Sequence, residues 1–201
     1  SVSDFPAFLT AYDPSDLPGG SLDPLGFERG YLHLADKILP GLTNVANRPR
    51  YFSMICAGAF LADIDAHASP RLQYQARLDS ILRCERLWAL ALVLAGQDSN
   101  AGDELSDSGI RGVTYARSAA ESLIRKRAQR TAADYKMLSR QVPYGAVGIY
   151  GAVADGMRFI DRATFTLTPD LGERLAEGFV EGTEMPQVLK KAIRVGGEVP
   201  V

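Results

Sequence analysis

The stretch that decides the fold is SPRLQYQARLDSILRCERLWALALVLA, from Ser69 to Ala95. Ser69 is a suitable helix N-cap, and Pro70 fits the first helical turn, where the missing backbone N–H has no cost. Apolar side chains then recur at spacings of three and four residues, as on one face of an α-helix. The members of this series are Leu78, Ile81, Leu82, Leu87, Trp88, Ala91 and Leu92. This long amphipathic segment predicts a helical core.

Six further segments have a helical pattern or the residues that begin and end helices. They cover residues 23–39, 51–66, 109–140, 145–159, 170–182 and 186–194, and the third is either one long helix or two shorter ones. Phe165, Thr166 and Leu167 are typical of a strand, and Thr168 is the expected cap of the next helix. We therefore expect an all-α, α-dominated fold with one small β-hairpin near residues 160–168.

Four parts of the chain differ in composition. Residues 1–22 are rich in proline and glycine, which predicts an irregular N-terminal arm. Residues 23–95 form the predicted helical domain, and the acidic, glycine-rich stretch 96–108 forms the predicted linker loop. Residues 109–201 form the second predicted domain, which begins with a basic helix.

The composition is that of an ordinary globular protein. Of 201 residues, 46% are hydrophobic and 23% are charged, and the net charge is −2, which excludes a mainly disordered chain. The longest apolar run, Leu87–Ala95, is far shorter than the about 20 residues of a membrane span, and Ser1–Thr10 lacks the pattern of a signal peptide. Cys56 and Cys84 lack metal-binding spacing, so we expect buried free thiols. These features predict a cytoplasmic protein without membrane contact.

The order of predicted elements in the C-terminal part is informative. A helix over 132–140, a turn at Pro143, a helix over 144–159 and an extended segment over 160–167 precede the helix start LTPDLGERLAEGF, Leu167–Phe179. This order resembles the winged-helix family over about 50 of the 201 residues. The helix in the position of the recognition helix departs from the family pattern, because it is rich in glycine and has Arg158 as its cation. Base-reading helices present polar side chains, so the resemblance implies a winged-helix-like shape that serves packing.

Positive charge is concentrated between Arg111 and Arg140, where eight basic residues accompany two acidic ones. On a continuous helix, most of these cations fall on one broad arc opposite an apolar side. Such a stripe neutralises phosphates without reading sequence. A solvated face, or a face that pairs with an acidic partner, is the alternative that stays open. The candidate nucleic-acid-binding residues of this segment are Arg117, Arg125, Lys126, Arg127, Arg130, Lys136 and Arg140.

Arg48 and Arg50 precede an apolar helix, with Pro49 fixing the backbone between them. Guanidinium groups suit bidentate contact with phosphate, so both arginines join the candidate nucleic-acid-binding residues; local ion pairs are the alternative. The surrounding segment LPGLTNVANRPRYFSM, Leu39–Met54, is similar to one in uncharacterised bacterial proteins associated with phage-defence gene clusters. This resemblance implies membership of a defence system and no particular mechanism.

The sequence lacks the common signatures of catalysis. It has no GxSxG, GxxxxGK[ST] or strand-linked GxGxxG motif, and its two histidines, His33 and His67, lack metal-binding spacing. Asp63 and Asp65 with Glu85 suggest a nuclease-type metal site, yet residues two apart on a helix point in different directions. We therefore predict no catalytic residue, no metal ligand and no cofactor, which favours a non-enzymatic role.

Three hypotheses follow, in order of preference. The first is a non-catalytic accessory subunit of a bacterial multi-protein system, antiviral by the resemblance above, that contacts nucleic acid non-specifically and binds a partner protein. The second is a scaffold subunit that binds proteins alone. The third is a metal-dependent nuclease that uses Asp63.

Overall fold

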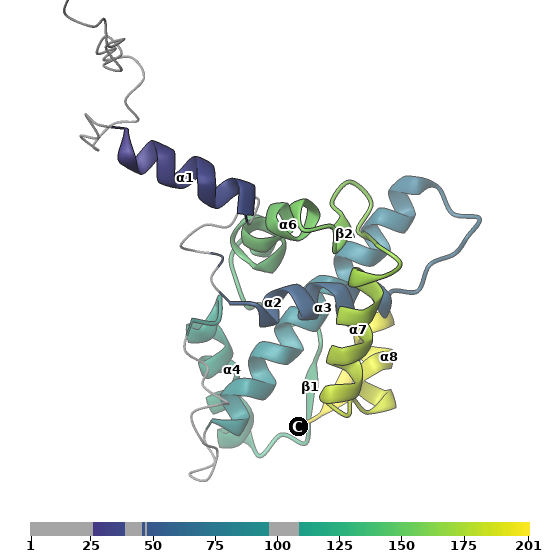
Figure 1. Ribbon diagram of the computed structural model, residues 1–201. Coiled ribbons are helices and arrows are strands. Elements are labelled where there is room, and N and C mark those ends of the chain that lie inside the picture. Colours follow the sequence, from purple (N-terminus) through teal and green to yellow (C-terminus); the bar gives the residue numbers. More distant parts are fainter. Residues whose placement is uncertain (1–25, 39–45, 47, 97–108) are drawn as a thin grey trace, which may run out of the picture. The chain divides into compact units, whose positions relative to one another are not determined.

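The structure, a computed structural model, describes residues 26–38, 46, 48–96 and 109–201 (Figure 1). Helices dominate, as predicted, and the described part contains eight of them together with two small two-stranded sheets. The predicted arm over 1–22 lies outside the described residues, as does the predicted linker over 96–108 apart from Gly96.

Contacts divide the chain into two units, Ser1–Pro40 and Gly41–Val201. The first unit contains α1 (Phe27–Ile38), which lies within the predicted helix over 23–39. One side of α1 is apolar and exposed to solvent. The residues on this side are Phe27, Tyr31, Leu34 and Ile38.

The second unit is built around α2 (Arg50–Phe60) and α3 (Pro70–Ala95), and α3 has the predicted boundaries. Gly58 permits their close contact, because a Cβ at this position would lie 2.6 Å from the Cα of Ile81. The two cysteines, one on each helix, are free and buried, which confirms the prediction.

The predicted end of α2 at Ala66 is wrong, because the helix stops at Phe60. In the segment that follows, Asp65 Oδ1 accepts a hydrogen bond from the backbone N–H of His67 at 2.8 Å. Aspartate forms such local turns in competition with helical hydrogen bonds. Asp63 and Asp65 are therefore exposed residues of a loop.

The segment 109–140, predicted as one long helix or two shorter ones, contains one helix that ends well before Arg140. α4 (Val113–Lys126) ends at Arg127, which has a left-handed backbone and donates its N–H to the Ile124 carbonyl. The next N–H, of Ala128, donates to the Leu123 carbonyl at 2.9 Å, which completes a Schellman-type helix end. The chain continues as β1 (Arg130–Ala132), and residues 133–140 contain turns in place of the predicted helix.

Two antiparallel pairs of strands are present in the described part. β2 (Ile160–Asp161) pairs with β3 (Thr166–Leu167), which confirms the predicted hairpin. β1 pairs with β4 (Glu198–Pro200), with Thr131 opposite Val199. The prediction of a single hairpin was incomplete, because this second sheet joins segments far apart in the sequence.

The C-terminal helices agree well with the sequence pattern. At the start of α7, Thr168 Oγ1 accepts a hydrogen bond from the Gly172 N–H at 3.1 Å, as expected of a capping side chain, although the N-cap position itself is Asp170. A short helix occupies the predicted turn around Pro143. These elements are α5 (Gln141–Tyr144), α6 (Ala146–Gly156), α7 (Leu171–Gly182) and α8 (Gln187–Val195).

Helix α3 is shared by two hydrophobic clusters. In the first, the ring of Tyr51 stacks on Tyr150 of α6 with centroids 4.4 Å apart, and Trp88 of α3 meets Tyr51 edge-on at 5.1 Å. In the second, a different face of α3 packs against the buried alanines of α4. This face consists of Ala89, Leu90 and Val93, opposite Ala116 and Ala120.

Candidate functional site

Three consecutive cations close α4. Arg125, Lys126 and Arg127 are exposed, and no carboxylate of the described part forms an ion pair with them. Arg117 lies two turns earlier on the exposed side of the same helix. The partial negative charge of the helix C-terminus favours cations here, and their side chains remain accessible to an anionic partner.

The other cations predicted on the same arc lie on different elements. Arg130 of β1 forms an ion pair with Glu198 of β4, with 3.1 Å between Nε and Oε2. The guanidinium of Arg140 lies over the ring of Tyr144 at 6.0 Å from its centroid, and Lys136 is exposed in the non-helical segment. The single basic arc does not form, because α4 ends before these residues.

Arg48 and Arg50 have different environments. The Arg48 side chain occupies the space beside Gly109, and its backbone N–H donates to the hydroxyl of Tyr150. Arg50, the first residue of α2, is exposed and lines the groove described below. Of these two candidate residues, Arg50 lies at the groove and Arg48 does not, and both also have interactions within the chain.

Glu85 is a fully buried carboxylate on α3. Its Oε1 accepts a hydrogen bond from the backbone N–H of Ala146 at 2.7 Å, and its Oε2 accepts one from the side chain of Gln141 at 2.8 Å. Burial raises the pKa of this carboxyl to about 7, although both hydrogen bonds act to lower it. Gln141 in turn accepts a hydrogen bond from Arg86 Nε at 2.7 Å. Glu85 therefore serves to hold the start of α6 and has no surface open to a substrate.

The three acidic residues that the sequence suggests as metal ligands do not lie close together. Asp63 and Asp65 are exposed in the loop after α2, whereas Glu85 is buried beside α6. Among the residues that the structure describes, no group of three His, Cys, Asp or Glu side chains could hold a metal ion. The nuclease hypothesis thus has no metal centre in this part of the chain.

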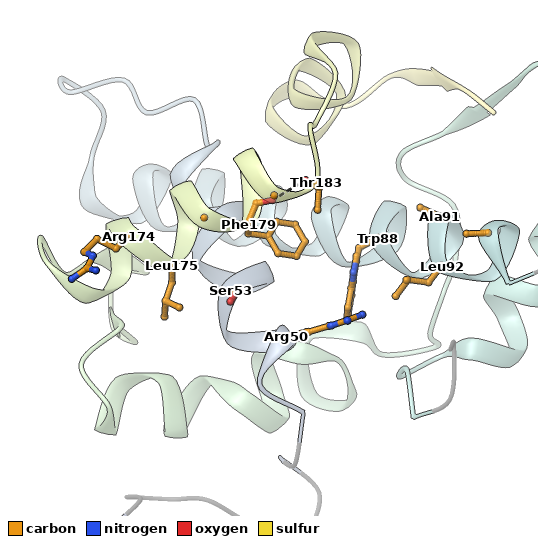
Figure 2. Close-up of a pocket in the computed structure, with 12 residues that line it drawn as sticks. Arg50, Ser53, Trp88, Ala91, Leu92, Arg174, Leu175, Phe179 and Thr183 are labelled. Atoms are coloured by element: carbon orange, nitrogen blue, oxygen red, sulfur yellow. Dashed lines mark hydrogen bonds between the residues drawn. The ribbon is translucent and has the colours of Figure 1, made fainter. Parts of the chain in front are cut away.

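A groove of about 500 Å³ lies over α2, between α3 and α7 (Figure 2). Helix α2 packs against both neighbours, whereas α3 and α7 scarcely touch each other. Trp88 and Leu92 of α3 face Leu175 and Phe179 of α7, and these four are the large apolar side chains that line the groove. Polar lining groups come from Arg50, Ser53, Arg174 and Thr183.

Family models, curated proteins and solved structures were compared with the chain, and none matches it. None of the helices within the described ranges is long and apolar enough to span a bilayer. Function is therefore inferred from the cations that close α4 and from the groove.

The sequence did not predict the buried carboxylate or the groove. The sequence pattern suggests Glu85 only as a metal ligand, because its partners Gln141 and Ala146 are 56 and 61 positions away. For the groove, one signal was present in the sequence. Gly178 lies inside the helix predicted over 170–182, where glycine is unfavourable unless something approaches the backbone closely.

Proposed function

We propose that this chain is a non-catalytic accessory subunit that contacts the phosphate backbone of nucleic acid. The exposed run Arg125, Lys126 and Arg127, without an ion pair in the described part, is the observation that carries the proposal. Cations on a helix end neutralise phosphates and release condensed counterions, which gives binding without sequence preference. Arg117 extends this contact along α4.

The winged-helix-like module of the C-terminal part is also a proposal. The order of α6, the hairpin β2–β3 and α7 supports it. Helix α6 contains no cation and presents Ala152 and Asp155 to solvent, so it lacks the side chains that read base edges. We therefore assign phosphate contact to α4 and a packing role to this module.

A partner protein is the second part of the proposal. The segment LPGLTNVANRPRYFSM resembles defence-associated bacterial proteins, and the groove over α2 offers an apolar surface to another subunit. On this basis we propose membership of a bacterial multi-protein system. A scaffold that binds proteins alone is the second candidate function, and the groove is the observation that favours it.

Fluorescence anisotropy with labelled duplex and single-stranded DNA across a salt series tests the nucleic-acid part. Affinity for the duplex should fall steeply with salt, and replacing Arg125, Lys126 and Arg127 by glutamate should reduce the logarithmic slope by about 3. The control variant Arg71→Glu, Lys191→Glu, Arg194→Glu changes the net charge equally at exposed residues of α3 and α8, and should retain most of the binding.

Each outcome separates the two candidate functions. Equal losses in both variants would attribute the binding to net charge and reject α4 as the interface. Flat titrations of the wild-type chain at low salt would reject nucleic acid as a ligand and leave the scaffold function.

A further inference from the structure

The groove over α2 is open where a fourth helix would complete the packing of α2, α3 and α7. Ala91 and Ala95 lie one turn apart on the α3 wall, and Gly178 and Gly182 lie one turn apart on the α7 wall. Side chains this small allow the axis of an added helix to approach both walls closely.

Packing within the described chain does not explain the two glycines. A Cβ at Gly178 or Gly182 would meet nothing within 4 Å, in contrast to Gly58. A glycine inside a helix costs about 0.5–1 kcal/mol relative to alanine, so Gly178 weakens α7 while it widens the groove. Gly182, the last residue of α7, widens the groove at the end of this helix. A ligand that comes close to the α7 backbone would use this space.

The lining determines which kind of segment fits. The groove walls are helices, which use their own backbone groups, and the Thr183 hydroxyl already donates to the Phe179 carbonyl at 2.7 Å. An extended peptide would leave its N–H and C=O groups unpaired against Trp88 and Phe179, at a considerable cost. An α-helix satisfies its own backbone groups, so an apolar groove of this kind favours a helix.

The charges determine the chemistry of that helix. Arg50 and Arg174 are the charged residues among those that line the groove, and the described lining contains no acidic residue. Figure 2 shows Arg174 beside Leu175 on α7 and Arg50 extending toward Trp88, so cations border the apolar surface from two helices. Arg50 already has an interaction within the chain, so Arg174 is the cation that offers its charge to a ligand. Complementary charge attracts an acidic segment and disfavours a basic one.

We propose that the groove binds an amphipathic α-helix of a partner protein. Its small and apolar residues face α2, and its acidic residues face Arg174. Helix-in-groove recognition of this type uses apolar anchors at positions i, i+4 and i+7. The assignment rests on the partner-binding part of the proposed function and is independent of phosphate contact by α4.

A display library of randomised helical peptides of about 20 residues, selected against the purified chain, is the probe. Enriched peptides should share one apolar face flanked by acidic residues. The variant Gly178→Leu, Gly182→Leu fills the groove from open space and should weaken their binding at least about tenfold. The control Gly30→Leu makes one such change on α1, where a Cβ also meets nothing within 4 Å, and should leave the binding unchanged.

The variant Arg174→Glu should weaken binding of the acidic peptides and strengthen binding of basic peptides with the same apolar face. The filled variant should unfold at a temperature no lower than that of the wild type, because it replaces a glycine inside α7, and its DNA binding should be unchanged. If that variant fails to fold, the arginine variant decides alone.

The remaining outcomes would each overturn a different part of the proposed helix binding. Enrichment of basic or uncharged helices would overturn the acidic partner and leave partner binding in place. A second outcome is that no peptide is enriched, while dodecanoate binds the wild type and binds the filled variant more weakly. The ligand of the groove would then be a small amphiphile and not a partner helix. If neither binds, both the inference and the partner-binding part of the proposed function are rejected, while nucleic-acid contact stands or falls by its own test.

Discussion

The backbone N–H of Ala146 donates a 2.7 Å hydrogen bond to the fully buried carboxylate of Glu85. A side chain of α3 thereby caps α6, whose own flanking residue provides no side-chain cap. Gly145 allows this approach, because a Cβ there would lie 2.7 Å from Oε2 of Glu85. The attachment of α6 to the core therefore depends on an ionisable group.

The free energy of unfolding should depend on pH through Glu85. Burial raises its pKa from 4.5 to about 7, so the folded chain holds this proton more tightly than the unfolded chain does. The resulting stability is complete below about pH 4.5 and is lost as the pH rises to about 7, by about 3 kcal/mol in total. Urea unfolding at about pH 5 and about pH 8 measures this difference. Glu85→Gln should flatten the profile, and an unchanged profile in this variant would assign the dependence to other groups.

Glycine-to-alanine changes should have opposite effects in α2 and α7. At Gly58, the new Cβ would collide with the backbone of Ile81, so Gly58→Ala should destabilise the fold by about 1–3 kcal/mol. At Gly178, the Cβ enters open space, so Gly178→Ala should stabilise it by about 0.5–1 kcal/mol. Chemical denaturation of both variants measures the two signs. Destabilisation by Gly178→Ala would mean that this face of α7 is already covered.

Arg127→Gly should stabilise the chain while it weakens nucleic-acid binding. Arg127 ends α4 with a φ of 49°, a conformation that glycine adopts without the steric cost of a Cβ. A gain of about 0.5–1 kcal/mol is expected from thermal or urea unfolding. Arg127→Ala is the control, because it removes the same charge and keeps the strain. A similar gain in both variants would show that charge repulsion, and not backbone strain, is relieved.

The two cysteine thiols should be unreactive in the folded chain. Cys56 and Cys84 are buried, and desolvation raises the pKa of each to about 12, so the reactive thiolate is scarce at neutral pH. Labelling with iodoacetamide, followed by mass spectrometry, should modify both only when denaturant is added. Rapid labelling of either thiol without denaturant would indicate local opening of α2 or α3.

Boundaries set by neighbouring residues were predictable. Ser69-Pro70 correctly gave the start of α3, and Thr168 gave the start of α7, because caps and prolines act within one turn. The hairpin β2–β3 was predictable for the same reason, since its strands are only a few residues apart.

Features that depend on distant residues were not predictable. Residues 127–140 contain neither glycine nor proline, so their pattern continued the helix of α4. In the structure, β1 pairs with β4, and the Ala133 N–H donates to the Gly197 carbonyl at 2.9 Å. The run of cations Arg125–Arg127 is visible in the sequence itself. The groove is not, because it exists only when α2, α3 and α7 are packed together.

Helix α3 contributes Trp88, Ala91 and Leu92 to the groove, and Leu90 and Val93 on another face to the contact with α4. The two proposed binding surfaces, the groove and the cations of α4, thus lie on opposite sides of α3. If a ligand that binds one surface shifts α3, the free energy of binding at the other surface changes. Thermodynamic linkage then requires the effect to be mutual: the factor by which a partner helix changes affinity for nucleic acid is the factor by which nucleic acid changes affinity for that helix.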